Sequence, residues 1–345
     1  STGATEMGQG VNTKIAQIAA NVFGIDTKSV RVMPTSTEKN HNTSPTAASS
    51  GADINGAATL KASLIIANRL RYVAHLLFSN VTFTDTKELP RPEEFFVNFV
   101  ERENQGHVYS SQLTPENIDY IEFKDGNVVD TKNNQSLPLT KILQVAYLNR
   151  VQMGEYAFFR TEGLGYDKKT GKGTPFKYFT NGAALSEVEI DEYTGELKIL
   201  RADILMDLGR SLNPNLDHGQ VSGAFVQGFG WLTTENLVYH SSGKLLSHSP
   251  TTYKIPNIQD IPRVFNIKLI ENHFDKASVH RSKAVGEPPL LLGTSVWTAV
   301  KHALSFRLNH IPAISAPATA EQILMELTKS LSERTESLSE NDKVA

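Results

Sequence analysis

One predicted helix is unusually rich in glycine, and this limits how the chain can pack. The segment opens at Asn213-Pro214, which fit the N-cap and first helical positions. Each glycine inside a helix costs roughly 0.5–1 kcal/mol relative to alanine. We therefore expect close packing of this helix against a ligand or another backbone. The glycines concerned are Gly219, Gly223, Gly228 and Gly230.

Composition places the chain among ordinary globular proteins. Its 345 residues suggest about two domains, and 39% hydrophobic with 21% charged residues argue against a disordered chain. The net charge of -3 gives no electrostatic reason to expect nucleic acid or an anionic membrane as a partner. No apolar run approaches the ~18 residues that a membrane-spanning helix needs.

The chain contains no cysteine, which limits its redox chemistry. Disulfides, thiolate zinc sites and protein-held iron–sulfur clusters are excluded, and the ten histidines lack metal-ligand spacing. We assign no residue to a metal and expect an organic or metallo-organic cofactor for any redox reaction. The first residues lack a signal-peptide pattern, which favours a cytoplasmic location, and open inside a glycine-rich motif, as a fragment boundary would.

Hydrophobic periodicity predicts an α+β fold, with mixed or antiparallel sheets packed with helices in two subdomains. Turn residues at 125–127 and 191–195 predict two hairpins, the second with Gly195 in a left-handed position, and 163–173 reads as an exposed loop. We place the first subdomain at 1–180, the second at 181–328 and a disordered tail at 329–345. Helices are expected over 11–23, 56–78 and 139–149 and from Asn213 onward, with Gly24 ending the first of them. Strands are expected at 30–32, 121–123, 128–129, 187–191, 196–199 and 202–206.

Three loops rich in glycine or serine lead into predicted helices. They are Gly3–Gly10, Asn42–Asp53 and the residues before Asn213. Helix N-termini present free N–H groups that suit phosphate, although such loops, taken singly, are more often ordinary turns. Neither the dinucleotide nor the P-loop glycine pattern is present. The three loops are better explained if their small residues converge on one larger cofactor.

Two glutamines lie in glycine-rich surroundings, Gln9 between Gly8 and Gly10, and Gln220 after Gly219. An amide offers two donors and an acceptor without charge, so it can bond an oxo group or a pterin edge at any pH. A lone glutamine is usually a solvated surface residue. The neighbouring glycines favour a ligand contact here.

The stretch Lys283–Pro289 reads Lys-Ala-Val-Gly-Glu-Pro-Pro. Pro288 disfavours helical φ and ψ at Glu287, and Gly286 lets a ligand approach the backbone. An apolar run, Leu290–Leu292, follows. We expect a carboxylate on a rigid corner whose burial raises its pKa, which makes it a candidate general base. A surface turn glutamate is the plainer alternative.

These motifs together resemble the molybdenum-cofactor region of the xanthine dehydrogenase family, in family order over residues 1 to about 310. The resemblance rests on Gly3–Gly10, Asn42–Ser50 with Asp53, Asp207–Gly209, Asn213-Pro214, Gly219-Gln220, Gln227-Gly228, Thr252–Pro256 and Ser282–Pro289. The last two stretches look more like xanthine dehydrogenase than like the aldehyde or carbon monoxide enzymes.

The resemblance implies a pyranopterin whose dithiolene holds molybdenum, as molybdopterin or its cytosine dinucleotide form. It implies that Glu287 takes a proton from Mo–OH, whose oxygen attacks hypoxanthine- or xanthine-type purines, while hydride passes to Mo=S. Such an enzyme is an oxidoreductase of purine catabolism. The residues it assigns to the cofactor are Gly8, Gln9, Gly10, Thr46, Ala47, Ala48, Ser49, Ser50, Gln220 and Gly286.

By the same resemblance, this chain is the C-terminal portion of the molybdenum subunit. The preceding half, iron–sulfur and flavin modules, NAD and a dimeric full enzyme are then expected elsewhere, and the chain alone is expected to be inactive and without molybdenum. Two alternatives remain open. One is a related hydroxylase acting on aldehydes or other N-heterocycles, and the other is a non-catalytic module with the same fold.

Overall fold

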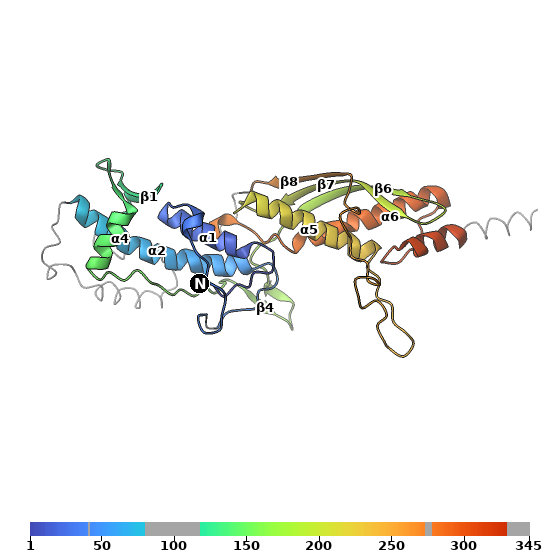
Figure 1. Cartoon of the computed structure of the whole chain (residues 1–345). Coiled ribbons are helices and arrows are strands. Elements are labelled where there is room, and N and C mark those ends of the chain that lie inside the picture. Colours follow the sequence, from blue (N-terminus) through green and yellow to red (C-terminus); the bar gives the residue numbers. More distant parts are fainter. Residues whose placement is uncertain (41, 80–117, 273–277, 330–345) are drawn as a thin grey trace, which may run out of the picture. The chain divides into compact units, whose positions relative to one another are not determined.

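The structure is a computed structural model, and we describe residues 1–40, 42–79, 118–272 and 278–329. The chain divides into two compact units, Ser1–Lys177 and Tyr178–Ala345, which are treated separately below (Figure 1). From sequence we place this boundary between 180 and 181. Residues 330–345 of the predicted disordered tail lie outside the described residues.

The first unit is built on a long helix with a short antiparallel sheet beside it. β1 and β2 are joined by the two-residue turn Asp125-Gly126, both at positive φ (50° and 76°), as a twisted hairpin requires. β3 pairs with β2, and β4 and β5 form a separate hairpin. Its elements are α1 (Val11–Phe23), η1 (Thr27–Ser29), α2 (Gly51–Phe78), β1 (Ile121–Lys124), β2 (Asn127–Asp130), β3 (Gln135–Pro138), α4 (Leu139–Leu148), β4 (Gly165–Asp167) and β5 (Lys172–Thr174).

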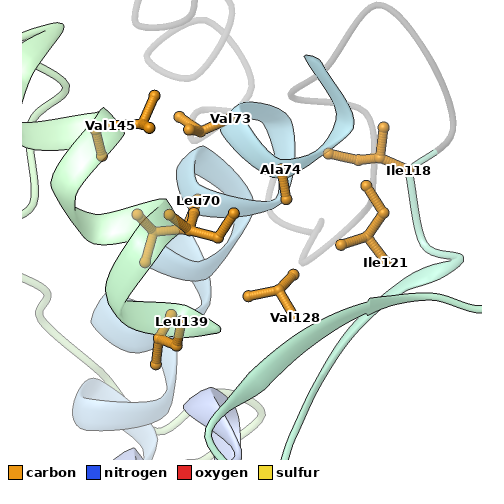
Figure 2. Packing of buried hydrophobic residues seen from close by; sticks show 10 residues of the cluster. Leu70, Val73, Ala74, Ile118, Ile121, Val128, Leu139 and Val145 are labelled. Carbon is orange, nitrogen blue, oxygen red and sulfur yellow. The ribbon is translucent and has the colours of Figure 1, made fainter. Parts of the chain in front are cut away.

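The main core of the first unit forms where α2, α4 and the β1–β2 hairpin meet. Leu70 and Ala74 of α2 point toward Ile121 and Val128 of the hairpin, with Val145 of α4 on the other side (Figure 2). Four of these five side chains are at most 1% exposed, and Val145 is 8% exposed. Burial of this apolar surface stabilises the packing of the C-terminal half of α2 against α4 and the hairpin.

The second unit is a three-stranded mixed sheet with helices on one face (Figure 1). β6 and β7 pair antiparallel, with a register shift at Glu187/Val188, and β8 pairs parallel to β7. Gly195 closes the β6–β7 hairpin at φ 72°. Its elements are β6 (Gly182–Ile190), β7 (Leu197–Asp207), α5 (Pro214–Thr233), β8 (Val264–Ile270), η2 (Val279–Arg281), η3 (Pro288–Gly293), α6 (Thr294–Leu308) and a helix that is described over 320–329.

Glycine lets α5 and η3 pack backbone against backbone. A Cβ on Gly228 would lie 2.1 Å from the Leu290 carbonyl oxygen, and one on Gly293 would lie 2.5 Å from the Gly228 carbonyl carbon. A Cβ on Gly230 would meet the Pro256 ring at 2.4 Å. Two of the four helix glycines are thus required by packing, as expected. The other two, Gly219 and Gly223, have no atom of the described residues within 4 Å of an added Cβ.

Several predicted elements are confirmed. α1 ends at Gly24, which adopts φ 57°, and Asn213 caps α5 by accepting from the Leu216 N–H at 3.2 Å. α2 begins at Gly51 rather than 56. The α+β class is confirmed by the mixture of helices and small sheets. Within the described residues, no helix is both long enough and apolar enough to cross a membrane.

Two predictions were wrong. The segment at 30–32 is extended but belongs to no sheet of the described residues, because alternation alone does not supply a partner strand. The predicted loop 163–173 is exposed but forms the β4–β5 hairpin. β8 was missed, although Phe265, Ile267 and Leu269 alternate with exposed residues in the sequence.

Candidate functional site: two half-sites, one in each unit

Gln9 is held inside the loop that precedes α1. Its Oε1 accepts from the Met7 N–H at 2.5 Å, and its Nε2 donates to the Thr5 carbonyl at 2.8 Å. The loop around it needs glycine, since Gly8 and Gly10 adopt φ 100° and 77°. These bonds fix the direction of the amide. A carboxamide nitrogen carries two hydrogens, so Nε2 can donate a second bond to a ligand.

The N-terminus of α1 is capped by a carboxylate of the same loop. Glu6 Oε1 accepts from the Gly8 and Gly10 N–H groups, both at 2.9 Å, and Oε2 accepts from the Asn12 N–H at 3.0 Å. Burial pushes the Glu6 pKa up, but the backbone donors outweigh it and the pKa is lowered. The expectation that this loop offers free N–H groups to phosphate is therefore wrong at Gly8 and Gly10. Sequence reasoning missed the role of Glu6.

The serine-rich loop is hydrogen-bonded to the glutamine loop. The Thr5 N–H donates to Thr46 Oγ1 at 2.9 Å. Ala48 and Ser49 both adopt positive φ (55° and 52°), a compact turn that exposes Ala47 and Ala48. Ser50 precedes α2, but its side chain accepts no N–H of the helix; its hydroxyl donates to the Ala47 carbonyl at 2.9 Å. Loops 41 residues apart in sequence thus lie together in one unit.

In the second unit, Gln220 is half-buried on α5, next to the open side of the helix. That side carries Gly219 and Gly223, one turn apart, where an added Cβ would meet nothing. Packing among the described residues does not require glycine at either position. The open glycine side is therefore available for close approach by a ligand.

Glu287 opens the short helix η3. Its φ of -96° and ψ of -38° are helical, so the predicted non-helical conformation was wrong. The Leu290 N–H bonds the Glu287 carbonyl at 3.0 Å and stabilises this turn despite the proline that follows. The side chain is exposed, so the described residues of this unit do not supply the predicted apolar surroundings. Half-buried Gly286 lies directly before it.

A buried ion pair supports the segment that leads to Glu287. Lys283 Nζ donates to Asp207 Oδ2 at 2.8 Å, and both side chains are 7% exposed. The Lys283 N–H bonds the Leu208 carbonyl, and the Ala284 N–H bonds the Tyr178 hydroxyl at 2.9 Å. In the sequence, Asp207 and Lys283 stand out only as members of the family motifs. Nothing local signals their pairing across 76 positions.

The predicted site residues therefore fall into two groups. We call Thr5–Gly10 with Thr46–Ser50 the first half-site, and Gln220 with Gly286-Glu287 the second half-site. Hydrogen bonds join the loops of the first, and the α5–η3 contact at Gly228 joins the segments of the second, about two helical turns from Gln220. The first unit brings its two loops together, whereas in the second unit the contact between α5 and η3 lies at Gly228 and not at Gln220. Among the described residues, no group of three or more His, Cys, Asp or Glu could hold a metal ion.

Curated relatives give the chain a family context. It is 36% identical over 329 residues to a xanthine dehydrogenase of Dictyostelium discoideum and 37% identical over 329 residues to the xanthine dehydrogenase/oxidase of Mus musculus. Each alignment covers 93% of this chain but only 20% of the relative. The chain thus spans about a fifth of the length of these relatives.

Solved structures agree in fold. Quinoline 2-oxidoreductase from Pseudomonas putida 86 matches with a TM-score of 0.70 and 22% identity, over 94% of this chain and 36% of that one. A Cu,Mo-CO dehydrogenase matches with a TM-score of 0.69 and 19% identity, over 95% and 36%. The family model described as a molybdopterin cofactor-binding domain matches residues 1–97 and 104–262. This chain therefore belongs to the molybdopterin cofactor-binding domain family.

Proposed function

We propose that the chain is the part of a xanthine dehydrogenase-like molybdenum hydroxylase that binds the cofactor and supplies the catalytic base. The observation that carries this is the identity of 36–37% with xanthine dehydrogenases over 93% of the chain. Hypoxanthine- or xanthine-type purines are the proposed substrates. Because the chain spans a fifth of those relatives, the activity is proposed for a complete enzyme and not for these residues alone.

The first half-site has the donor chemistry that a molybdenum-pterin group requires. Gln9 offers a fixed amide N–H, while Thr46 and Ser49 offer hydroxyls in a loop of small side chains. Ala47 and Ala48 are exposed and leave room beside them. We assign these residues, with Ser50, to the pterin and its phosphate. Gly8 and Gly10 contribute by shaping the loop rather than by donating, since Glu6 uses their N–H groups.

The second half-site supplies the reacting carboxylate. The bound group would take two electrons from the substrate carbon, which gains a hydroxyl derived from water. Glu287 is exposed in its own unit, so its carboxylate can be reached by solvent and by a ligand. We assign Glu287 as the base that accepts the proton and Gln220 as the amide that contacts the cofactor across open Gly219 and Gly223. Gly286 allows close approach beside Glu287.

Other modules complete the reaction. Electrons would pass to iron–sulfur and flavin groups and then to NAD, all held by polypeptide outside these residues, since this chain has no cysteine to hold a cluster. A dimeric full enzyme and a cytoplasmic location belong to the same proposal. Because only part of the cofactor site is present, we expect the isolated chain to contain little molybdenum by elemental analysis.

Turnover of the complete enzyme tests the proposal. Rates with xanthine, quinoline and an aromatic aldehyde, each divided by bound molybdenum, should rank xanthine first. A preference for quinoline or the aldehyde would point to the related hydroxylases instead. Stoichiometric molybdenum without turnover of any of the three would favour a non-catalytic module.

A further inference from the structure

An extended stretch of the first unit has the exposure pattern of a β-strand but belongs to none of the sheets in the described part of the chain. From Val151 to Thr161, half-buried and exposed side chains alternate without interruption. Strict alternation is typical of a strand with one face against a core. The stretch therefore has the form of a strand, but none of the described residues forms a neighbouring strand beside it.

Contacts from α2 hold one edge of this stretch. Arg69 Nη1 donates to the Gln152 and Gly154 carbonyls at 3.3 and 3.4 Å, and its Nη2 bonds Glu155 Oε2 at 2.5 Å. In an extended strand, the N–H and C=O of one residue point to the same edge, and alternate residues share that edge. Even-numbered residues thus face Arg69. Ala157 and the other odd-numbered residues present their backbone groups to the opposite edge.

A groove of about 650 Å³ runs along the same stretch. Residues 155–161 form one wall, and Ser1–Gly3, Asn40, Asn42–Ser44 and the first turns of α2 form the rest. The Nδ2 atom of Asn40 is buried there and makes no hydrogen bond to any described residue. A buried donor of this kind normally has an acceptor, and the described residues do not supply one.

We propose that residues 155–161 are the edge strand of an incomplete sheet, and that an extended strand of further polypeptide pairs with them in the groove. Seven residues of strand span about 23 Å, an edge that another strand can follow but a compact ligand cannot. We assign the pairing strand to the additional polypeptide that the relatives possess, because this chain covers only 20% of their length. Carbonyl groups of that strand provide the acceptor for Asn40.

Hydrogen exchange tests the pairing directly. Amides of 155–161 are compared between the 345-residue chain alone and the native enzyme purified from its source with all its polypeptide. Exchange of the odd-numbered amides in this range, whose N–H groups point away from Arg69, should be at least about 100-fold slower in the native enzyme, because a strand pair must open before these amides exchange. Amides of β6 and β7, already paired in this chain, should be protected in both samples. Equal exchange at 155–161, or a native enzyme without further polypeptide, overturns the proposal.

A matched pair of variants separates strand pairing from general burial. Ala157→Pro removes one N–H from the edge opposite Arg69, while Ala157→Ser keeps it. Ala157→Pro should abolish the protection at 155–161 or prevent retention of the partner polypeptide, and Ala157→Ser should do neither. Unchanged protection in Ala157→Pro contradicts the pairing. This inference depends on the family of the chain and does not depend on the proposed purine reaction. Hydrogen exchange can therefore test it even if the enzyme does not turn over purines.

Discussion

Lys283 and Asp207, 76 positions apart, form a buried ion pair that ties the end of β7 to the segment leading to Glu287. Their Nζ···Oδ2 distance is 2.8 Å, and Asn272 Nδ2 and the Gly209 N–H also donate to the same carboxylate, at 3.0 and 2.8 Å. Three donors satisfy an ion that burial would otherwise destabilise. The pair therefore fixes where the chain turns toward the proposed base.

Removing one partner should destabilise the second unit. Lys283→Met leaves the Asp207 carboxylate buried without its counter-charge, which costs about 3–5 kcal/mol in free energy of unfolding. Both tryptophans, Trp231 and Trp297, lie in this unit, so urea unfolding followed by tryptophan fluorescence reports on it selectively. The control is Lys268→Met, an exposed lysine on β8. Equal midpoints for the two variants would refute the stabilising role.

The same carboxylate predicts an acid-sensitive stability. Burial raises the Asp207 pKa, but Lys283, Gly209 and Asn272 outweigh burial and lower the pKa below its ordinary value of 3.8. The folded state then binds fewer protons than the unfolded state, so stability is present above pH 3.8 and is lost as the pH falls through the lowered pKa. Fluorescence-detected unfolding over this range should show the loss. In Lys283→Met the slope should be smaller, and an unchanged slope would contradict this account.

Two glycines of α5 should respond oppositely to alanine. In Gly228→Ala the new Cβ would lie 2.1 Å from the Leu290 carbonyl oxygen, so α5 and η3 must separate, at a cost of about 1–3 kcal/mol or more. In Gly219→Ala the new Cβ meets nothing, and the helix gains about 0.5–1 kcal/mol in the isolated chain. Urea midpoints check both. A loss of stability in Gly219→Ala would mean that the open side is occupied.

The carboxylate cap of α1 makes a local prediction. Glu6→Gln keeps the shape but weakens three charge-assisted bonds, and loss of a cap costs about 1 kcal/mol. Amides of 11–23 should then exchange about five-fold faster, as measured by mass spectrometry. Glu38→Gln, an exposed glutamate of the same unit, is the control. Identical exchange in both variants would show that Glu6 does not stabilise α1.

Local signals predicted much of the fold. Gly24 and Asn213 mark helix ends through their own conformation or side chain, and Asp125-Gly126 specifies a tight hairpin. Pairing between distant segments was not predictable, since the sequence around 30–32 does not reveal whether a neighbouring strand exists.

The candidate site residues were assigned because their motifs resemble a known family, and that assignment stays a prediction. The hydrogen bonds and ion pairs that position these residues were not predictable from the sequence. Glu6 could have been found from local pattern, because a carboxylate a few positions before a helix can accept its first N–H groups. The Lys283–Asp207 pair and the Thr5–Thr46 bond depend on tertiary structure, so no spacing rule signals them.

Glu287 carries the mechanistic assignment, and one substitution tests it. Glu287→Gln keeps the size and hydrogen-bonding capacity of the side chain but removes its ability to accept a proton. In the complete enzyme we expect kcat for xanthine, divided by bound molybdenum, to fall by the ~10²–10⁴ typical of a lost general base. Folding and molybdenum content should survive, because the change is isosteric and Glu287 is exposed. Glu189→Gln, the same change at an exposed position on β6, should leave turnover unaltered. Near wild-type turnover in Glu287→Gln would show that Glu287 is not the base and is an ordinary carboxylate at a surface turn.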